Sequence, residues 1–187
     1  GAETLSKIMD WNDRSTCVLF GDGAGAAVLE ATNADKGGVQ SCILGADGIK
    51  GVALHCANRR PNNPLVRGSH ELDYVSMDGQ AVYKFAVKTV PMTIEAALKK
   101  AGVAAEEIHQ FILHQANIRI IEAVAKRLEL PMDKFPVNLS THGNISAASV
   151  PILLDEMKRA GKIQSGDRIV LAGFGGGLTW GAAVLEW

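Results

Sequence analysis

Two polar side chains stand in this sequence at points where apolar runs end. His114 directly follows the apolar residues 111–113, and Asn144 comes soon after the strand-like stretch 134–139. Ligands in open α/β sheets gather at the carboxyl ends of strands, so both residues are candidates for one site. A neutral imidazole N–H and an amide N–H would suit a developing enolate or oxyanion. The alternatives are structural: a His satisfied by nearby backbone, and an Asn that serves as a turn residue or N-cap.

Two glycine-rich stretches add further candidates. Residues 173–182 read GFGGGLTWGA, without the Gly-Lys-Ser/Thr ending of a phosphate-binding loop. They predict either a hairpin turn or a place where backbone N–H groups approach a reacting atom. Residues 21–27 read GDGAGAA, but strand-like residues follow them instead of a helix. We therefore interpret these earlier glycines as a turn between two strands and not as a dinucleotide-binding loop.

The composition is that of a soluble globular protein. The chain has 187 residues, of which 47% are hydrophobic and 21% charged, and its net charge is −1. This balance gives no reason to expect a nucleic acid or an anionic membrane as partner. The sequence has no run of about 20 apolar residues, so no membrane-spanning helix is expected. The N-terminus lacks the features of a signal peptide, so we expect a cytoplasmic protein, and it lacks a starting Met, which suggests a piece of a longer chain.

The three cysteines give no sign of a disulfide framework or a zinc site. Cys17, Cys42 and Cys56 are widely spaced and form no Cys-x-x-Cys pair. We expect all three to be buried, reduced thiols, as is usual for a cytosolic protein.

The elements that would position these residues alternate between strand and helix. Strands are expected at 15–20, 24–32 and 38–48, and a long excursion at 50–76. A helix is expected over 78–101, kinked or split at Pro91 and ended by Gly102. The order then continues as strand 108–113, helix 117–130, strand 134–139, helix 145–161 and strands 167–174 and 178–187. This alternation predicts a layered α/β fold, in which residues 1–32 look like the tail of a preceding unit.

Four motifs in this order and spacing resemble the β-ketoacyl-acyl carrier protein synthase III family. They are GDGAGAAVLE from Gly21, HQAN from His114, HGNISAAS from His142 and GFGGGLTWGAA from Gly173. The resemblance covers essentially the whole chain and implies a thiolase-like fold, with a mixed sheet, flanking helices and half of a layered αβαβα architecture. It also implies a division into residues 1–34, the tail of an N-terminal half, and 35–187, a C-terminal condensing-enzyme domain.

The resemblance implies an acyltransferase of fatty acid biosynthesis. In the family, a Cys takes an acyl group, usually acetyl, from coenzyme A, and the carbanion from decarboxylated malonyl-acyl carrier protein attacks it. His114 and Asn144 match the catalytic His and Asn, which donate hydrogen bonds to the malonyl thioester carbonyl. Phe174 matches an aromatic wall of the malonyl site, and Gly176 matches a backbone donor of the oxyanion hole. Coenzyme A thioester is then a substrate, and neither a metal nor a tightly bound cofactor is expected.

Further positions match the family's binding surfaces. Arg14 matches a residue near the adenine of coenzyme A, and Gly79, Tyr83 and Asn117 match the pantetheine tunnel. Three basic residues of the helix after His114 match or extend a surface that meets the acidic carrier protein: Arg119, Lys126 and Arg127. An ordinary solvated helix face is an equally good interpretation of Lys126 and Arg127.

The family's nucleophilic Cys lies in a segment resembling AACAGF, which this sequence does not contain. We therefore expect the nucleophile in a missing N-terminal half, an inactive isolated chain and exposed apolar surface. In full-length form we expect a homodimer. Two alternatives stay open: a polyketide-type or other specialised condensing enzyme of the same fold, and a non-catalytic module for carrier-protein binding or oligomerisation.

Overall fold

A four-stranded mixed sheet forms the centre of the molecule. The computed structural model describes residues 1–31, 37–57, 65 and 73–187. The strand order is β3 (Gly38–Ala46), β8 (Thr179–Glu186), β7 (Arg168–Gly175) and β6 (Gln110–Leu113). Only β6 and β7 pair in parallel, whereas β8 runs antiparallel to both of its neighbours. The pairing of β7 with β6 aligns Leu113 with Ala172. The next residue, His114, therefore lies beside the C-terminal third of β7.

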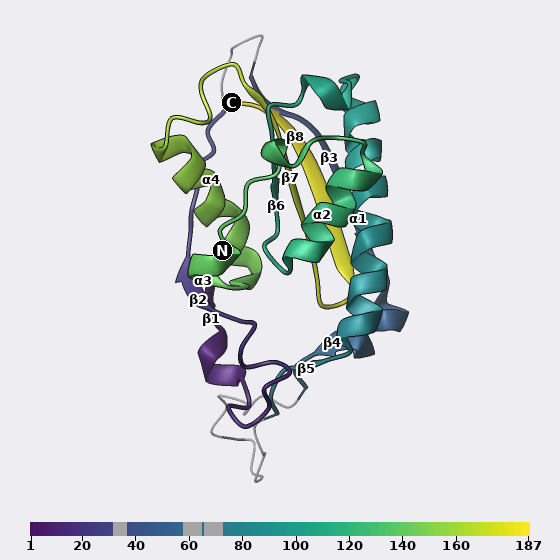
Figure 1. Ribbon diagram of the computed structural model, residues 1–187, viewed down its shortest axis with the longest axis vertical. Helices are drawn as coiled ribbons and strands as arrows, with labels where there is room; N and C mark the ends of the chain where they lie inside the picture. The colour runs from purple at the N-terminus through teal and green to yellow at the C-terminus, as the bar shows by residue number, and fades with distance from the viewer. Residues whose placement is uncertain (32–36, 58–64, 66–72) are drawn as a thin grey trace.

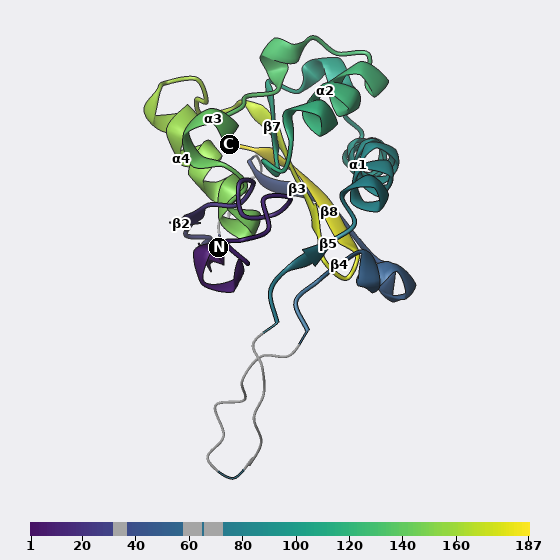
Figure 2. The same cartoon turned by 60° about the horizontal axis from the view of Figure 1, so that its bottom comes forward.

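Helices cover both faces of this sheet (Figure 1). The helices α1 (Gly79–Ala101) and α2 (Ile118–Arg127) lie on one face, and α4 (Ser149–Arg159) lies on the other, as Figure 2 also shows. Strand β6 explains why, since its alternate side chains are apolar on both sides. Phe111 belongs to the core under α1 and α2, and Ile112 packs with Leu153 of α4.

Helix α1 has the predicted ends. The Asp78 carboxylate accepts hydrogen bonds from the N–H groups of Gln80 and Ala81, which caps the first turn. Gly102 ends the helix in the left-handed conformation, with φ of 69°. Pro91 does not split the helix, contrary to one of our two expectations. Its neighbours Val90 and Ile94 are 4% and 0% exposed, so tertiary packing holds the helix through the missing hydrogen bond.

The strand expected at 15–20 does not form, and of the strand expected at 24–32 the described residues 25–31 are not extended. Residues 15–19 form turns, and only β2 (Asp22–Ala24) is extended, paired with β1 (Ala2–Thr4). Val28 and Leu29 are 94% and 82% exposed and belong to no strand. Both predictions were wrong because strand propensity needs a neighbouring strand to hydrogen-bond, and the described residues offer none to 25–31.

The strand expected at 134–139 is also absent. Residues 132–134 form a 3-10 helix, and the short α3 (Leu139–His142) begins at the end of the stretch. The buried side chain of Gln115 explains this arrangement. Its Nε2 contacts the carbonyls of Leu113 and Pro136 at 2.8 and 3.4 Å, and its Oε1 accepts from the Asn138 N–H at 3.2 Å. The amide thus takes the bonds that a sheet ladder would make.

The cysteines are not buried as expected. Cys42 is exposed on β3, and Cys17 and Cys56 are half-buried; all three are free thiols. Cys42 lies with Leu44, which is 80% exposed, on the part of the sheet face that α4 leaves uncovered. The burial prediction was wrong because this half of the sheet has no covering layer among the described residues.

The excursion at 50–76 is partly described. It starts with a 3-10 helix over Gly48–Ala53 and holds the two-stranded pair β4 (Leu54–His55) and β5 (Ser76–Met77). Residues 58–64 and 66–72 lie outside the described part. No helix in the described ranges is long and apolar enough to cross a membrane.

Candidate active site

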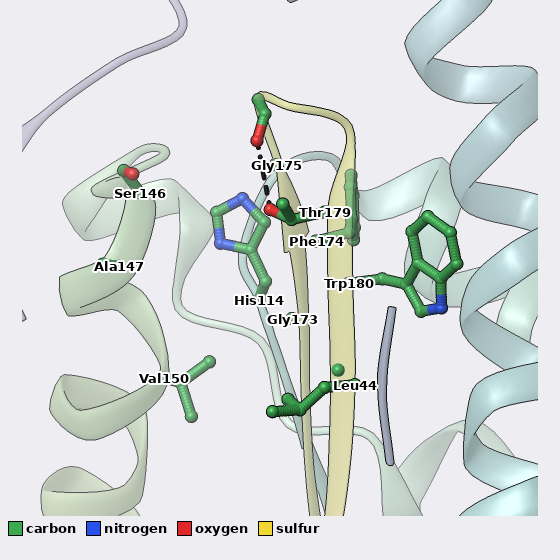
Figure 3. A pocket seen from close by; sticks show the side chains of 12 residues that line it. Leu44, His114, Ser146, Ala147, Val150, Gly173, Phe174, Gly175, Thr179 and Trp180 are labelled. Atoms are coloured by element: carbon green, nitrogen blue, oxygen red, sulfur yellow. Dashed lines mark hydrogen bonds between the residues drawn. The ribbon is translucent and has the colours of Figure 1, made fainter. Parts of the chain in front are cut away.

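His114 sits directly after β6 and points between two elements. Its N–H donates to the Ala172 carbonyl at 2.8 Å, which extends the pairing of β6 with β7 by one residue. Figure 3 shows the imidazole between the turn that carries Ser146 and the β7–β8 hairpin. Its ring meets the ring of Phe174 edge-on, with 5.2 Å between centroids. The side chain is 8% exposed, so it is a buried polar group that needs partners.

A serine holds the inner nitrogen of this imidazole. Nδ1 of His114 lies 2.7 Å from Oγ of Ser149, at the start of α4. The same hydroxyl oxygen contacts the Gln115 N–H at 3.2 Å and the Ser146 carbonyl at 2.8 Å. Burial lowers the pKa of His114 to about 4, although the nearby Ser146 carbonyl partly opposes this shift. The imidazole is therefore neutral at physiological pH.

Asn144 presents its amide N–H to the same region. Its Oδ1 accepts a hydrogen bond from the Ser146 N–H at 2.9 Å, which fixes the orientation of the amide. Its Nδ2 has no hydrogen-bond partner among the described residues and is free to donate. The backbone of Asn144 is held by the N-terminal segment: its N–H donates to the Leu19 carbonyl, and its carbonyl accepts from the Gly21 N–H, both at 2.9 Å.

His114 and Asn144 both line one hollow of about 290 Å³, which we call the central hollow. Its walls include α1, the turn before α2, the turn at Asn144, the end of β7 and residues 15, 19 and 20. Seven of the predicted site residues line it: Gly79, Tyr83, His114, Asn117, Asn144, Phe174 and Gly176. Its described lining contains no Asp, Glu, Lys or Arg. The central hollow can thus offer hydrogen-bond donors to an anionic oxygen in a setting of low polarity.

A second, wider hollow meets the first at His114. It encloses about 550 Å³ and is lined by Leu44, Ala147 and Val150 together with the β7–β8 hairpin (Figure 3). His114, Ser146, Phe174, Gly175 and Gly176 belong to both hollows. His114 therefore borders both hollows.

The glycine-rich stretch forms the hairpin turn that was one of its two interpretations. Residues 173–182 form the end of β7, a hairpin turn and the start of β8. Gly176 is exposed in this turn and lines both hollows, and its carbonyl accepts from the Thr179 hydroxyl at 3.0 Å. Phe174 forms one wall and packs edge-on against Phe85 of α1, at 6.3 Å between centroids.

The remaining predicted residues lie further out. Asn117 caps α2, because its Oδ1 accepts from the Arg119 N–H at 2.9 Å, and it also lines the central hollow. Arg14 is exposed and does not line that hollow, although its neighbour Ser15 does. Three basic side chains are exposed on α2: Arg119, Lys126 and Arg127.

Sequence reasoning missed Ser149 and Gln115. Ser149 gave no signal beyond its place at the end of the HGNISAAS motif, and Gln115 gave none beyond its place next to His114. Both are buried, at 1% and 0% exposure, and both contact the surroundings of His114. The one signal available in the sequence was a Ser at the start of the helix that follows Asn144. No group of three His, Cys, Asp or Glu side chains in the described ranges is arranged to hold a metal ion.

The fold and the site define a class: an α/β protein in which a neutral imidazole and an amide converge on a hollow without charged walls. Two sequence models agree with it. Residues 98–187 match the C-terminal model of 3-oxoacyl-[acyl-carrier-protein] synthase III, and residues 1–48 match the other model of the same family. The chain belongs to the 3-oxoacyl-[acyl-carrier-protein] synthase III family, as its four motifs predicted. Its fold is thiolase-like, with a mixed sheet and flanking helices, which confirms the predicted fold class.

Individual relatives support this placement. The whole chain is 46% identical to the beta-ketoacyl-[acyl-carrier-protein] synthase III of Synechococcus and covers 56% of it. In structure it matches the 3-oxoacyl-[acyl-carrier-protein] synthase III of Aquifex aeolicus, with a TM-score of 0.90, 43% identity and coverage of 100% of this chain and 56% of the other. A priming beta-ketosynthase of a polyketide biosynthetic pathway gives 0.82 at 30% identity, covering 98% of this chain and 55% of the other. The chain thus spans little more than half the length of these relatives.

Proposed function

We propose that the protein condenses an acyl-coenzyme A primer, acetyl in the first instance, with malonyl-acyl carrier protein and so initiates fatty acid synthesis in the cytoplasm. The observation that carries this proposal is the convergence of two neutral donors, His114 and Asn144, on the central hollow. Family membership supports the same activity.

The donors suit the decarboxylation step. When the malonyl group loses CO2, the C–C bond to the carboxylate breaks and its electron pair moves into the thioester as an enolate. The new negative charge sits on the thioester oxygen, where hydrogen bonds from Nε2 of His114 and Nδ2 of Asn144 stabilise it. The carbanion carbon then attacks the acyl thioester of a Cys, whose sulfur leaves as thiolate. Each donor is worth roughly 3 kcal/mol in the transition state.

The walls of the hollow support the same step. The Phe174 ring keeps water away from the malonyl carboxylate, which favours its loss as neutral CO2. The Gly176 N–H acts in the oxyanion hole of the acyl-Cys. Gly79, Tyr83 and Asn117 line the path of the pantetheine arm, and Arg14 contacts the adenine end of coenzyme A from the surface.

The carrier protein docks on α2. Arg119, Lys126 and Arg127 are exposed on this helix, which begins at the rim of the central hollow with Asn117. Positive side chains there would meet an acidic carrier and steer its phosphopantetheine arm into the hollow.

Residues 1–187 by themselves do not complete the reaction. None of the three cysteines is among the described residues that line the central hollow. We propose that the nucleophile lies in an N-terminal half that supplies the other wall, that residues 1–34 pack as the tail of that half, and that the full protein is a homodimer. The exposed apolar residues of the sheet face, including Leu44, are consistent with such a covering half.

One rival has a specific observation in its favour. The likeness to a polyketide priming ketosynthase shows that this fold also serves specialised acyl condensation, where the primer differs but the donor pair need not. A non-catalytic carrier-binding module is disfavoured, because docking alone does not require two buried donors.

The test is product formation by the full natural protein. Acetyl-coenzyme A and malonyl-acyl carrier protein should give acetoacetyl-acyl carrier protein, detected by mass spectrometry, with an acetyl adduct on a Cys outside residues 1–187. Purified 187-residue chain should give none. Product from longer or branched primers but not from acetyl would favour the specialised rival, and no product from any primer would reject a condensing function.

A further inference from the structure

The short helix α3 ends at His142, just before Asn144, and contacts from outside the helix must fix its place. It has only 4 residues, too few for a helix to be stable by itself. We propose that Asn138 and Glu156 are positioning residues: the hydrogen bond between their side chains holds α3 in place and thereby sets where the Asn144 amide lies. Their role in the reaction rests on the proposed function, which uses Asn144 as a donor.

Asn138 stands at the N-cap position of α3 but does not cap the helix with its side chain. Asn is favoured at such a position because its side-chain oxygen can accept from the N–H groups of the first turn, yet no such bond forms here. Instead, Nδ2 of Asn138 donates to Oε2 of Glu156 on α4 at 2.8 Å. An ionised carboxylate only accepts, so the amide nitrogen must face it. The bond therefore has a defined direction, and the side chain is committed to α4.

The backbone of Asn138 ties the start of α3 to the end of β6. Its N–H donates to Oε1 of Gln115 at 3.2 Å, and Gln115 is the buried residue next to His114. Its carbonyl accepts from the N–H groups of Thr141 and His142 at 3.1 and 3.2 Å, and from the Thr141 hydroxyl at 2.9 Å. Asn138 thus joins the first turn of α3 both to the strand that carries His114 and to α4.

The carboxylate of Glu156 reaches both ends of α3. Oε2 binds Asn138 at the start, and Oε1 lies 3.3 Å from Nε2 of His142, the last residue of the helix. Only Gly143 separates His142 from Asn144, so a shift of α3 passes to the backbone of Asn144. Asn138 is 9% exposed, and loss of its partner would leave a buried amide that has to move to find another.

A neighbouring ion pair on α4 shows how the contact of Glu156 differs from an ordinary surface contact. Asp155 and Arg159 bond at 2.6 Å within one helix, and their side chains are 56% and 79% exposed. Exposed pairs of this kind contribute little to stability. Glu156 instead joins α4 to a second element through a buried amide, which is the arrangement expected of a positioning residue.

The experiment exchanges the two groups of the pair in the full natural protein. In Asn138→Asp two carboxylates face each other, and their repulsion should displace α3 and Asn144. Combining it with Glu156→Gln restores a hydrogen bond in the reverse direction, because the new amide donates to the new carboxylate. The 15N resonance of the Asn144 side-chain amide, assigned by its loss in Asn144→Ala, reports the position of this amide without substrate. It should shift in Asn138→Asp and return towards the wild-type value in the double variant.

Two further variants make the comparison specific. Asp155→Asn is the matched control, because it removes a carboxylate from the same turn of α4 that bonds only Arg159 among the described side chains. It should leave the Asn144 resonance unchanged. Glu156→Ala removes the carboxylate at a partly exposed helical position that Ala suits, so it tests the pair even if Asn138→Asp does not fold. It should shift the Asn144 resonance.

CO2 release from malonyl-acyl carrier protein gives the second readout. On the proposed function, Asn138→Asp should slow this step about tenfold, because one donor is misplaced while the imidazole stays. The double variant should recover most of the lost rate, and Asp155→Asn should keep the wild-type rate. A role in stability alone would not tie the rate to the direction-reversed bond.

Two results would overturn the proposal: an Asn144 resonance that stays in place in folded Asn138→Asp or in Glu156→Ala, or a double variant displaced as far as Asn138→Asp alone. Both are independent of the proposed function, since they need no substrate. Conversely, undiminished malonyl decarboxylation in Asn144→Ala would reject the proposed function of this amide and leave the resonance results standing.

Discussion

His114 and Asn144 face the same hollow, yet different parts of the chain hold them. His114 extends a strand of the central sheet and contacts Ser149 at the start of α4. Asn144 stands in a turn whose backbone is paired with residues 19–21, a segment without a core of its own. On the proposed function, which uses both donors, the site therefore joins a rigid scaffold to a segment that depends on its neighbours.

The difference shows in what each side can tolerate. The His114 side is stabilised by burial of apolar side chains, which resists small displacements. The Asn144 side depends on a few backbone hydrogen bonds and on Gly143, whose φ of 67° suits glycine. An added Cβ there would lie 3.2 Å from the Leu19 carbonyl oxygen. We expect damage to the hollow to start on the Asn144 side.

The largest expected effect comes from removing either donor. His114→Ala and Asn144→Ala in the full natural protein should each lower the rate of malonyl-acyl carrier protein decarboxylation by about 10²- to 10³-fold, because each loses one hydrogen bond to the enolate. CO2 release measures the step. His109→Ala is the control, since His109 lies at the far end of β6 and bonds the Lys162 carbonyl. If only one of the two variants is impaired, the donors do not act as a pair.

A smaller effect should separate the two sides. Gly143→Ala should cost about 1 to 3 kcal/mol through backbone strain and displace the Asn144 amide. Decarboxylation should fall while the 15N resonances of His114 stay in place. Gly161→Ala is a matched control: Gly161 has a φ of 69° and open space around its Cβ position, but ends α4 away from the hollow. Equal loss of activity in both variants would show that lowered stability, and not the position of Asn144, is responsible.

The smallest expected effect is a pH dependence of the free energy of unfolding that comes from His114 and not from Asn144. The pKa of His114 falls from 6.5 to about 4 on burial, so below pH 6.5 the unfolded chain binds a proton that the folded chain does not. The free energy of unfolding therefore decreases as the pH drops from 6.5 towards 4. The decrease is roughly 2 kcal/mol at pH 5. Urea unfolding at pH 7.5 and pH 5 should show this difference in the wild type and lose it in His114→Asn. Asn144→Ala should keep the wild-type dependence, since an amide does not titrate.

The sequence predicts the regular elements of the fold better than the segments in which distant contacts override local propensity. Helix α1 was predictable because a capping Asp78, a periodic apolar face and Gly102 all agree. The strand expected at 24–32 failed because its partner is not among the described residues. The strand at 134–139 failed because one amide side chain, Gln115, replaces a ladder, which no propensity encodes.

The candidate site divides in the same way. Motifs placed His114, Asn144, Phe174 and Gly176 together, and the structure brings them to one hollow. Ser149 was not predictable as a partner of His114, because their contact joins the end of β6 to the start of α4 across 35 positions of sequence. Contacts of this kind depend on the packing of elements and not on local pattern.

The absence of charged side chains from the described lining of the central hollow has a consequence for salt. At about 0.1 M ionic strength, dissolved ions screen interactions between exposed charges that lie more than about 10 Å apart. They hardly affect hydrogen bonds between neutral groups in a buried site. On the proposed function, added salt should therefore weaken the approach of an acidic carrier to α2 and leave the chemistry at the hollow unaffected. Ionic strength becomes a means of telling encounter from reaction in this family.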